Sequence, residues 1–167
     1  LPVRMGDSFR YGYKVGTVED IGLRSVKVRT LDRTLVRIPN GSFSQMQLEN
    51  FAARDRIWFS PTLGLRYETT ADQLQAVMKG LREVMLAHPK VDPDPARVRF
   101  TKFGAYSLDL EIFAYVKTSD FGEFLEVQQE IYLQFMRVVE DCGSGFAFPS
   151  QTLYMARDGG VGPASLR

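Results

Sequence analysis

The side chains with the most reactive chemistry in this chain are its single histidine and its single cysteine. His88 precedes Pro89 at the expected end of one helix, and Cys142 lies at the expected end of another. A cysteine nucleophile needs an adjacent histidine and a third group that orients the histidine. Nothing in the expected topology brings His88 and Cys142 together, and there is no second histidine to share a metal ion. We therefore predict structural roles for both residues.

Neighbouring carboxylates are the next candidates, because two that face each other in a cleft can work as acid and base. Glu140 and Asp141 are adjacent on an expected helix, so their side chains do not face each other. Asp92 and Asp94 flank Pro93 in a turn that is typical of a solvated loop. The sequence therefore predicts that the chain is not an enzyme and that it needs no metal and no cofactor.

Aromatic and basic residues alternate near the start of the chain, a pattern that could stack nucleobases. The same alternation arises when aromatic rings pack in a core and the aliphatic stems of lysine and arginine cover them. We favour core packing. The residues concerned are Phe9, Tyr11 and Tyr13, interleaved with Arg10, Gly12 and Lys14.

Composition limits the class of protein. A formal net charge of +1 and a hydrophobic share of 44% suit one ordinary domain or two small ones and argue against a strongly polyanion-seeking protein. No stretch approaches the ~18 consecutive apolar residues that a membrane span needs. One cysteine excludes an internal disulfide and fits a reducing compartment. The start lacks a signal-peptide pattern and does not begin with Met, so we expect a fragment of a longer protein.

The near-neutral net charge hides an asymmetry along the chain. Residues 1–56 hold ten Lys and Arg against six Asp and Glu, a net charge of +4, whereas residues 57–167 carry −3. A basic first part suits a position beneath an anionic membrane leaflet, where each nearby cation gains about 1 kcal/mol. Chance variation in surface charge would also produce such a difference.

The pattern of the first third of the chain predicts short antiparallel strands. β-branched residues recur at alternate positions in residues 26–29 and 35–38, which is typical of half-buried strands. The stretch from Thr30 to Thr34 lies between them and is expected to form a hairpin loop. Gly12 and Gly16 mark an earlier turn.

The residues after the second of these strands predict a sharp turn. Pro39 has no N–H and is expected to end the strand at Ile38. Asn40 and Gly41 tolerate positive φ, so the chain can reverse there. We therefore expect this first unit to consist of strands and turns alone.

Residues after 56 alternate between strand and helix patterns. Thr70 to Gln73 is a capping box, and apolar residues at helical spacing follow it. A second helix is expected between a cap at Asp120, with Glu123, and an end at Cys142 and Gly143. The expected strands are Ile57 to Leu65 with a bend at Pro61, Val98 to Phe103, Leu108 to Val116 and a short one near Phe146, and the expected buried helix residues are Leu74, Val77, Met78, Leu81, Val84, Met85, Phe124, Ile131, Phe135 and Val138.

The order strand, helix, strand, strand, helix, strand is that of the split βαβ, ferredoxin-like arrangement. For residues 1–55, whose pattern contains only strands and turns, we predict an all-β domain, a small Sm-like five-stranded barrel or sheet. An α+β ferredoxin-like domain (βαββαβ) is expected to follow in residues 56–157. Residues 158–167 are expected to form a flexible tail because glycines open that stretch.

Several motifs resemble those of one family. The order Gly16-Thr17-Val18, Ile21, Arg24, Val28-Arg29-Thr30, Asp32 and Ile38-Pro39-Asn40-Gly41 is similar to the middle β-domain of the small-conductance mechanosensitive channel family. Val3 to Phe9 resembles the family's segment just after the pore-lining helix, Asn50-Phe51 resembles the strand end that leaves the β-domain, and Phe146 to Gln151 resembles the closing aromatic–proline segment. The resemblance covers roughly residues 3 to 155. Arg33 departs from it, because a glycine is common at this place in the hairpin loop.

This resemblance implies a part in a channel rather than in catalysis. Membership would imply a ring of seven identical subunits, with β-domains side by side below the pore and α/β units forming a cage that filters ions and small solutes. The channel would open under membrane tension during osmotic downshock. The chain would lie on the cytoplasmic side of the inner membrane, attached by an upstream segment. The implied subunit-packing residues are Gly16, Thr17, Arg24, Arg29, Thr30, Asp32, Pro39, Asn40 and Gly41, and the implied axial last strand is Gln151, Thr152, Leu153, Tyr154 and Met155.

Two other classes stay open on the residues alone. Sm-like barrels and ferredoxin-like units are both used by soluble nucleic-acid-binding modules, and the net +4 of the first part favours one. The net −3 of the second part and the lack of an RNA-binding strand motif argue against it, so no nucleic acid is expected as a partner. Ferredoxin-like folds also host small enzymes and metabolite-binding regulators, but this chain lacks the side-chain constellations that such sites need.

Overall fold

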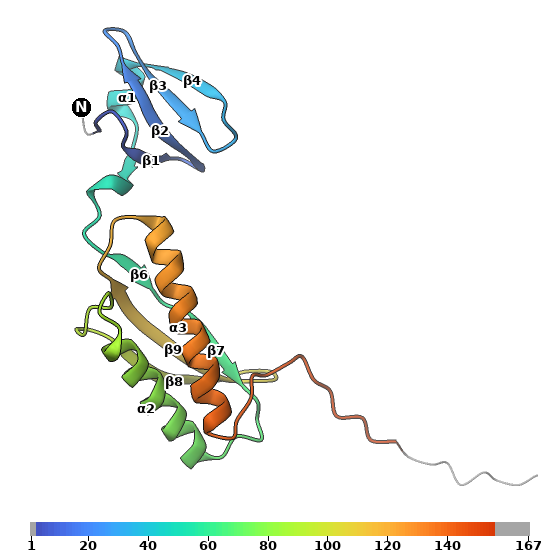
Figure 1. Ribbon diagram of the computed structural model, residues 1–167. Coiled ribbons are helices and arrows are strands. Elements are labelled where there is room, and N and C mark those ends of the chain that lie inside the picture. The colour runs from blue at the N-terminus through green and yellow to red at the C-terminus, as the bar shows by residue number, and fades with distance from the viewer. Residues whose placement is uncertain (1–2, 156–167) are drawn as a thin grey trace, which may run out of the picture.

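The computed structural model describes residues 3–155 of the chain and arranges them as two units placed end to end (Figure 1). Each unit has its own cluster of buried apolar side chains, one within residues 3–48 and one within residues 57–146. The expected boundary between residues 55 and 56 falls between these clusters and stays a prediction. The expected flexible tail, residues 158–167, lies outside the described residues.

The first unit is built on a five-stranded antiparallel sheet with the order β4-β3-β2-β1-β5. The alternation in the sequence explains it, because Val26, Val28 and Ile38 all point into the core of this unit. Within the described residues β4 and β5 do not pair, so the sheet is open. The strands are β1 (Ser8–Tyr11), β2 (Lys14–Ile21), β3 (Ser25–Thr30), β4 (Leu35–Pro39) and β5 (Leu48–Asn50).

A helix stands where the sequence predicted a sharp turn. The strand was expected to end at Ile38, but β4 includes Pro39 as its last residue. Pro39 pairs with Ser25 of β3. Asn40 and Gly41 then open the six-residue helix α1 (Asn40–Gln45) with negative φ. The expectation of a unit made only of strands and turns was therefore wrong. Phe43, fully buried against Phe9, explains why a helix forms here.

β5 ends at Asn50, where the resemblance implied a strand end, and the chain leaves the first unit through a short 3-10 helix, η1 (Phe51–Ala53). The ring of Phe51 lies near two guanidinium groups. The Cζ of Arg54 is 4.0 Å and that of Arg10 is 5.3 Å from its centroid. Such cation–π contacts tie the start of the link to the first unit.

The end of the link is tied to the second unit. Arg56 donates a hydrogen bond to Asp92 at 2.9 Å, and its Cζ lies 4.3 Å from the ring centroid of Tyr115. Asp55 lies between the two sets of contacts, with its side chain almost fully exposed.

The second unit is a sheet with helices on one face. β9 is its centre, with β8 along one edge and β6 and β7 along the other. Ile57 lies opposite Val116 and Leu65 opposite Leu108 in one continuous register, so β6 and β7 are a single edge strand broken at Pro61, the expected bend. The elements are β6 (Ile57–Phe59), β7 (Thr62–Leu65), α2 (Ala71–Ala87), β8 (Arg97–Phe103), β9 (Leu108–Val116) and α3 (Phe121–Asp141).

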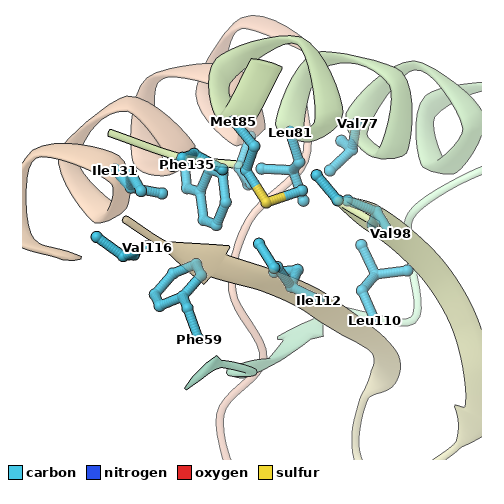
Figure 2. Close-up of a cluster of buried hydrophobic side chains, with 14 of the residues drawn as sticks. Phe59, Val77, Leu81, Met85, Val98, Leu110, Ile112, Val116, Ile131 and Phe135 are labelled. Atoms are coloured by element: carbon cyan, nitrogen blue, oxygen red, sulfur yellow. The ribbon is translucent and has the colours of Figure 1, made fainter. Parts of the chain in front are cut away.

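Both helices cover the same face of this sheet (Figure 1). Every second residue of β9 from Leu108 to Val116 is buried, so one face of the strand supplies the core and the other does not. Figure 2 shows the core from α2 (Val77, Leu81, Met85), α3 (Ile131, Phe135) and the strands (Phe59, Val98, Leu110, Ile112, Val116).

The helix ends follow the sequence signals closely. Thr70 and Gln73 form both hydrogen bonds of the capping box at the start of α2. Asp120 caps α3, and Gly143 follows its last turn with φ 73°. Three core assignments differ: Met78, Val84 and Val138 are only partly buried against the core, whereas Val127 and Val139 of α3, which were not expected there, are buried.

The expected final strand near Phe146 is reduced to a single bridge. Phe146 pairs with Leu65 of β7 in antiparallel fashion, and the backbone N–H of Ala147 donates to the carbonyl of Gly64 at 2.9 Å. The chain therefore returns to the edge strand of the sheet but does not run along it.

Candidate functional site

Gly16 lies inside β2 rather than in a turn, and it marks a close approach between strands. A Cβ there would lie 2.3 Å from Cγ1 of Val28, a distance that real side chains do not reach. Gly12 alone makes the turn expected between Gly12 and Gly16, with φ 58°. Thr17 follows on the opposite face, and its hydroxyl contacts that of Ser8 at 3.0 Å.

The hairpin expected between β3 and β4 is present, and threonines close it. The hydroxyls of Thr30 and Thr34 are 2.6 Å apart, and the backbone N–H of Thr30 donates to the carbonyl of Thr34 at 3.0 Å. Arg33 has φ 67°, the left-handed conformation that glycine adopts most easily. The loop therefore keeps a glycine-like backbone with an arginine in place, and Asp32 is exposed beside it.

Arg29 holds the same hairpin from the strand side. Its Nε and Nη2 donate to the two carboxylate oxygens of Glu19 at 2.7 and 3.0 Å, and its Nη1 donates to the carbonyl of Arg33 at 3.0 Å. Glu19 is the bulge residue of β2, between the partners of Val28 and Lys27. The hydrogen bonds from Arg29 lower the pKa of the Glu19 carboxyl.

Asn40 ties the start of α1 to the loop between β2 and β3. Its side-chain amide donates to the carbonyls of Gly22 and Leu23 at 3.1 and 3.0 Å, and its backbone N–H donates to that of Arg24 at 3.0 Å. Gly41 has open space where a side chain would stand. The Asn40 side chain thus supplies the hydrogen bonds that keep this loop closed.

The structure divides the predicted packing residues between two ends of the sheet. Gly16 pairs with Thr30 and Thr17 with Arg29, so these residues gather near the hairpin together with Asp32. The others surround the β2–β3 loop at the far end of β3: Arg24, Pro39, Asn40 and Gly41. The motif is therefore two loop-closing clusters rather than one site, and a role in subunit packing stays a prediction.

The segment from Gln151 to Met155 makes no strand in the described chain and is exposed throughout. Its apolar members are nearly free of contacts: Leu153 is 79%, Tyr154 94% and Met155 92% exposed. The axial strand that the resemblance implies for these residues stays a prediction, since strand pairing there would need partners from another chain.

The contacts of two acidic residues, Asp7 and Glu19, were not predicted from the sequence. Asp7 accepts hydrogen bonds from the backbone N–H of Arg4 and from the amide of Asn50, both at 2.9 Å, and these lower its pKa. The bond from Asn50 joins the start of the chain to β5. The two residues are 43 positions apart, and nothing in the sequence pattern predicts their contact. The pairing of Glu19 with Arg29 likewise has no signal in the sequence, because it depends on the bulge in β2.

The histidine and the cysteine lie at opposite ends of the helix pair. Nε2 of His88 is 2.7 Å from a carboxylate oxygen of Glu130 in α3, and its Nδ1 accepts the backbone N–H of Lys90 at 3.1 Å. Cys142 caps the far end of α3, beside Gly143, whose carbonyl accepts from Gln73 at the start of α2. The two do not meet, as predicted.

Residues 3–155 contain neither a metal-binding cluster nor a helix suited to span a membrane. No group of three or more His, Cys, Asp and Glu side chains there is placed to hold a metal ion. None of the helices in that stretch has the length and apolar character to cross a bilayer.

Comparisons with known proteins agree in both units. A family model described as "Mechanosensitive ion channel MscS, C-terminal" matches residues 61–146, and one described as "Mechanosensitive ion channel, beta-domain" matches residues 1–53. An uncharacterized MscS family protein of Aquifex aeolicus is 39% identical over 93% of this chain and 43% of its own length. The small-conductance mechanosensitive channel MscMJ of Methanocaldococcus jannaschii is 34% identical over 94% and 45%. The chain thus spans less than half the length of these relatives.

Solved structures show the same fold. The closed-state crystal structure of Helicobacter pylori MscS superposes with a TM-score of 0.78 at 20% identity, over 94% of this chain and 60% of that one. Arabidopsis thaliana MSL1 A320V superposes with a TM-score of 0.79 at 18% identity, over 89% and 56%. Because the matching family models and relatives are those of mechanosensitive ion channels rather than enzymes, the chain belongs to the MscS family of mechanosensitive ion channels.

Proposed function

We propose that this chain is the cytoplasmic part of a channel that opens under membrane tension and releases ions and small solutes during osmotic downshock. Seven copies close into a ring on the cytoplasmic side of the inner membrane, to which a segment outside these 167 residues attaches them. The β-domains form the collar below the pore, and the α/β units form a cage whose side openings filter solutes. No catalysis and no nucleic acid take part.

The observation that carries this proposal is agreement with channel relatives through both units at once. The relative from Aquifex aeolicus aligns over 93% of the chain, from the β-sheet through the helices. A single shared module would not indicate the same job, because one fold serves many functions. Two consecutive modules in the same order within one chain make a shared architecture the better explanation.

The topology supports the finer fold names within this proposal. β9 lies between β8 and the β6–β7 edge strand, and Phe146 returns beside Leu65 at the outer side of that edge. Two helices on one face complete a ferredoxin-like unit, with the fourth strand shortened to one bridge. The five short antiparallel strands of the first unit suit an Sm-like sheet, open in one chain.

Exposed apolar residues in the last described segment support assembly. Leu153, Tyr154 and Met155 would be costly to leave in water along an ordered strand, and they stand at alternate sides of a potential strand. Equivalent segments from other copies would pair with this one and cover its side chains. A closed ring of such strands has no unpaired edge.

The test uses the complete channel that contains this chain. Purified channel is cross-linked and its mass in detergent measured by light scattering, and cells lacking their own tension-activated channels are shifted from high to low osmolarity. We expect a seven-subunit particle and survival of the shock only in cells that express the channel. A monomer, or a particle that gives no protection and no tension-activated current in membrane patches, would contradict the proposal.

A further inference from the structure

Within the part of the chain that the structure describes, one face of the sheet in the second unit has no helix on it. α2 and α3 both pack on the face that carries the buried residues of β9 (Figure 1). The other face presents the alternate residues, among them Phe113 and Tyr115 of β9 and Trp58 of β6. Trp58 is 62% exposed, although a tryptophan ring is among the most costly surfaces to leave in water.

Three aromatic rings on this face contact one another, with planes inclined by 54° between Trp58 and Phe113 and by 89° between Phe113 and Tyr115, and we call this cluster the aromatic platform. Trp58 lies directly across from Tyr115 in the strand register. The ring centroids of Trp58 and Phe113 are 6.1 Å apart, and those of Phe113 and Tyr115 are 5.4 Å apart. Because the rings come from two adjacent strands, the sheet itself holds their positions.

Arginines border the aromatic platform. The Cζ of Arg97 on β8 lies 4.2 Å from the ring centroid of Phe113, and Arg99 points to the same face two residues further along. Within residues 3–155 neither arginine takes part in a salt bridge, although Glu111 lies opposite Arg99 in the register. Arg56 borders the other side, and its charge is offset by Asp92 at 2.9 Å.

The side chains of this face are suited to a ligand in which a flat aromatic ring is joined to an anion. Aromatic side chains on an open sheet stack nucleobases, since every base has a flat π-face, and arginine adds cation–π contact. Guanidinium groups also bind phosphate through paired hydrogen bonds. Same-face neighbours on a strand are about 7 Å apart, so Arg97 and Arg99 can contact successive phosphates of one molecule.

We propose that the aromatic platform binds a free nucleotide, with its base stacked on the exposed ring of Trp58 and its phosphates at Arg97 and Arg99. The site lies on one chain and needs no partner subunit. It is therefore independent of the proposed ring, and its failure would leave the family assignment and the proposed channel role untouched.

The test exploits the fact that Trp58 is the only tryptophan in the chain. The fluorescence of the 167-residue protein is titrated with ATP, with adenosine and with inorganic triphosphate, and free N-acetyltryptophanamide is titrated in parallel to correct for absorption and collisional quenching. We expect saturable quenching by ATP. Adenosine and triphosphate alone should bind about tenfold or more weakly, since each lacks one of the two contacts.

Two matched variants locate the site. Arg97→Gln should weaken ATP binding about tenfold through loss of a charged hydrogen-bond donor. Arg82→Gln removes another exposed arginine, from α2 on the helix side of the sheet, and should leave binding unchanged. Arg99→Gln provides a second test, and circular dichroism melts confirm that each variant is folded.

Each other outcome overturns the proposal. Quenching by ATP that never saturates, or that is the same in Arg97→Gln and Arg82→Gln, would show that no built site exists. Saturable binding of a single-stranded oligonucleotide without binding of ATP would replace the nucleotide by nucleic acid. Triphosphate that binds as tightly as ATP would show that the aromatic platform does not stack the base.

Discussion

Gly16 of β2 and Val28 of β3 lie so close together that a methyl group added to Gly16 would overlap the side chain of Val28. The Cβ of an alanine at position 16 would lie 2.3 Å from Cγ1 of Val28 and 3.3 Å from the carbonyl oxygen of Arg29. Val28 is fully buried, so it cannot turn away into solvent. The requirement for glycine here is one of space, because its φ is ordinary for a strand.

We predict that Gly16→Ala destabilises the protein by about 1–3 kcal/mol through overpacking. Gly41→Ala is the matched control, because nothing lies within 4 Å of its added Cβ and its φ is compatible with alanine. It should be neutral or stabilising by up to about 1 kcal/mol. Urea unfolding of both variants measures the difference. Equal stability of the two variants would refute the packing argument. So would a failure of Val28→Ala to reduce the destabilising effect of Gly16→Ala in the double mutant.

Removal of the Asn40 amide should open the loop between β2 and β3. Asn40→Ala deletes both hydrogen bonds to Gly22 and Leu23, and we expect a loss of about 1–3 kcal/mol. Asn40→Asp should lose at least as much, because a carboxylate cannot donate to carbonyls. Gln45→Ala in the same helix is exposed and should change stability by less than about 0.5 kcal/mol. Thermal melts decide, and a stable Asn40→Asp variant would contradict the assignment of the amide as donor.

The pair of Glu19 and Arg29 should give the stability a pH dependence on the acid side. The folded pKa of Glu19 lies below its unfolded value of about 4.3. The pair therefore contributes its full stability above that unfolded value, and the contribution is lost as the pH falls through the folded pKa. Glu19→Gln should lower the melting temperature at pH 7 and approach the wild type as the carboxyl of the wild type becomes protonated.

Melts across this pH range, at low and at high salt, measure the effect of Glu19→Gln. Glu126→Gln serves as the control, since Glu126 is exposed on α3 and forms no salt bridge within residues 3–155. Added salt should reduce the loss in Glu19→Gln because the pair is accessible to solvent. A gap between wild type and Glu19→Gln that stays constant down to acid pH would argue against the ion pair.

The exposed end of the described chain should matter for assembly and not for folding. Truncation after Ser150 removes Leu153, Tyr154 and Met155, whose exposed fractions of 79%, 94% and 92% show that they make almost no contact with the rest of the described chain. The melting temperature of the single chain should stay the same, whereas the complete channel should lose its oligomeric mass. Truncation after Met155 is the control and should assemble. Loss of folding in the first variant would contradict this view.

The sequence patterns predicted the second unit well, because each signal there is long and repeated. Helix α2 follows a capping box with apolar residues at helical spacing, and β9 alternates over nine residues. Such patterns persist whatever the rest of the chain does. The error at Val138 and Val139 is small, since neighbours on a helix lie 100° apart and either can face a core.

The first unit was less predictable because short elements depend on tertiary contacts. The letters Pro39-Asn40-Gly41 are typical of a turn, yet burial of Phe43 draws Asn40 and Gly41 into a six-residue helix. Gly16 indicated a turn, although the close approach of Val28 was its actual reason. The pairing of Glu19 with Arg29 depends on a bulge that no residue type announces.

The anchored link between the two units has a mechanical consequence. Arg54 is held against Phe51 on one side, and Arg56 is held by Asp92 and Tyr115 on the other, so a single residue separates the two attachments. Rotation about the two backbone dihedrals of Asp55 is the motion that swivels one unit against the other without breaking either anchor. Torque that passes through this link is therefore concentrated on the backbone of Asp55. The stiffness of that backbone sets how closely the second unit follows a rotation of the first.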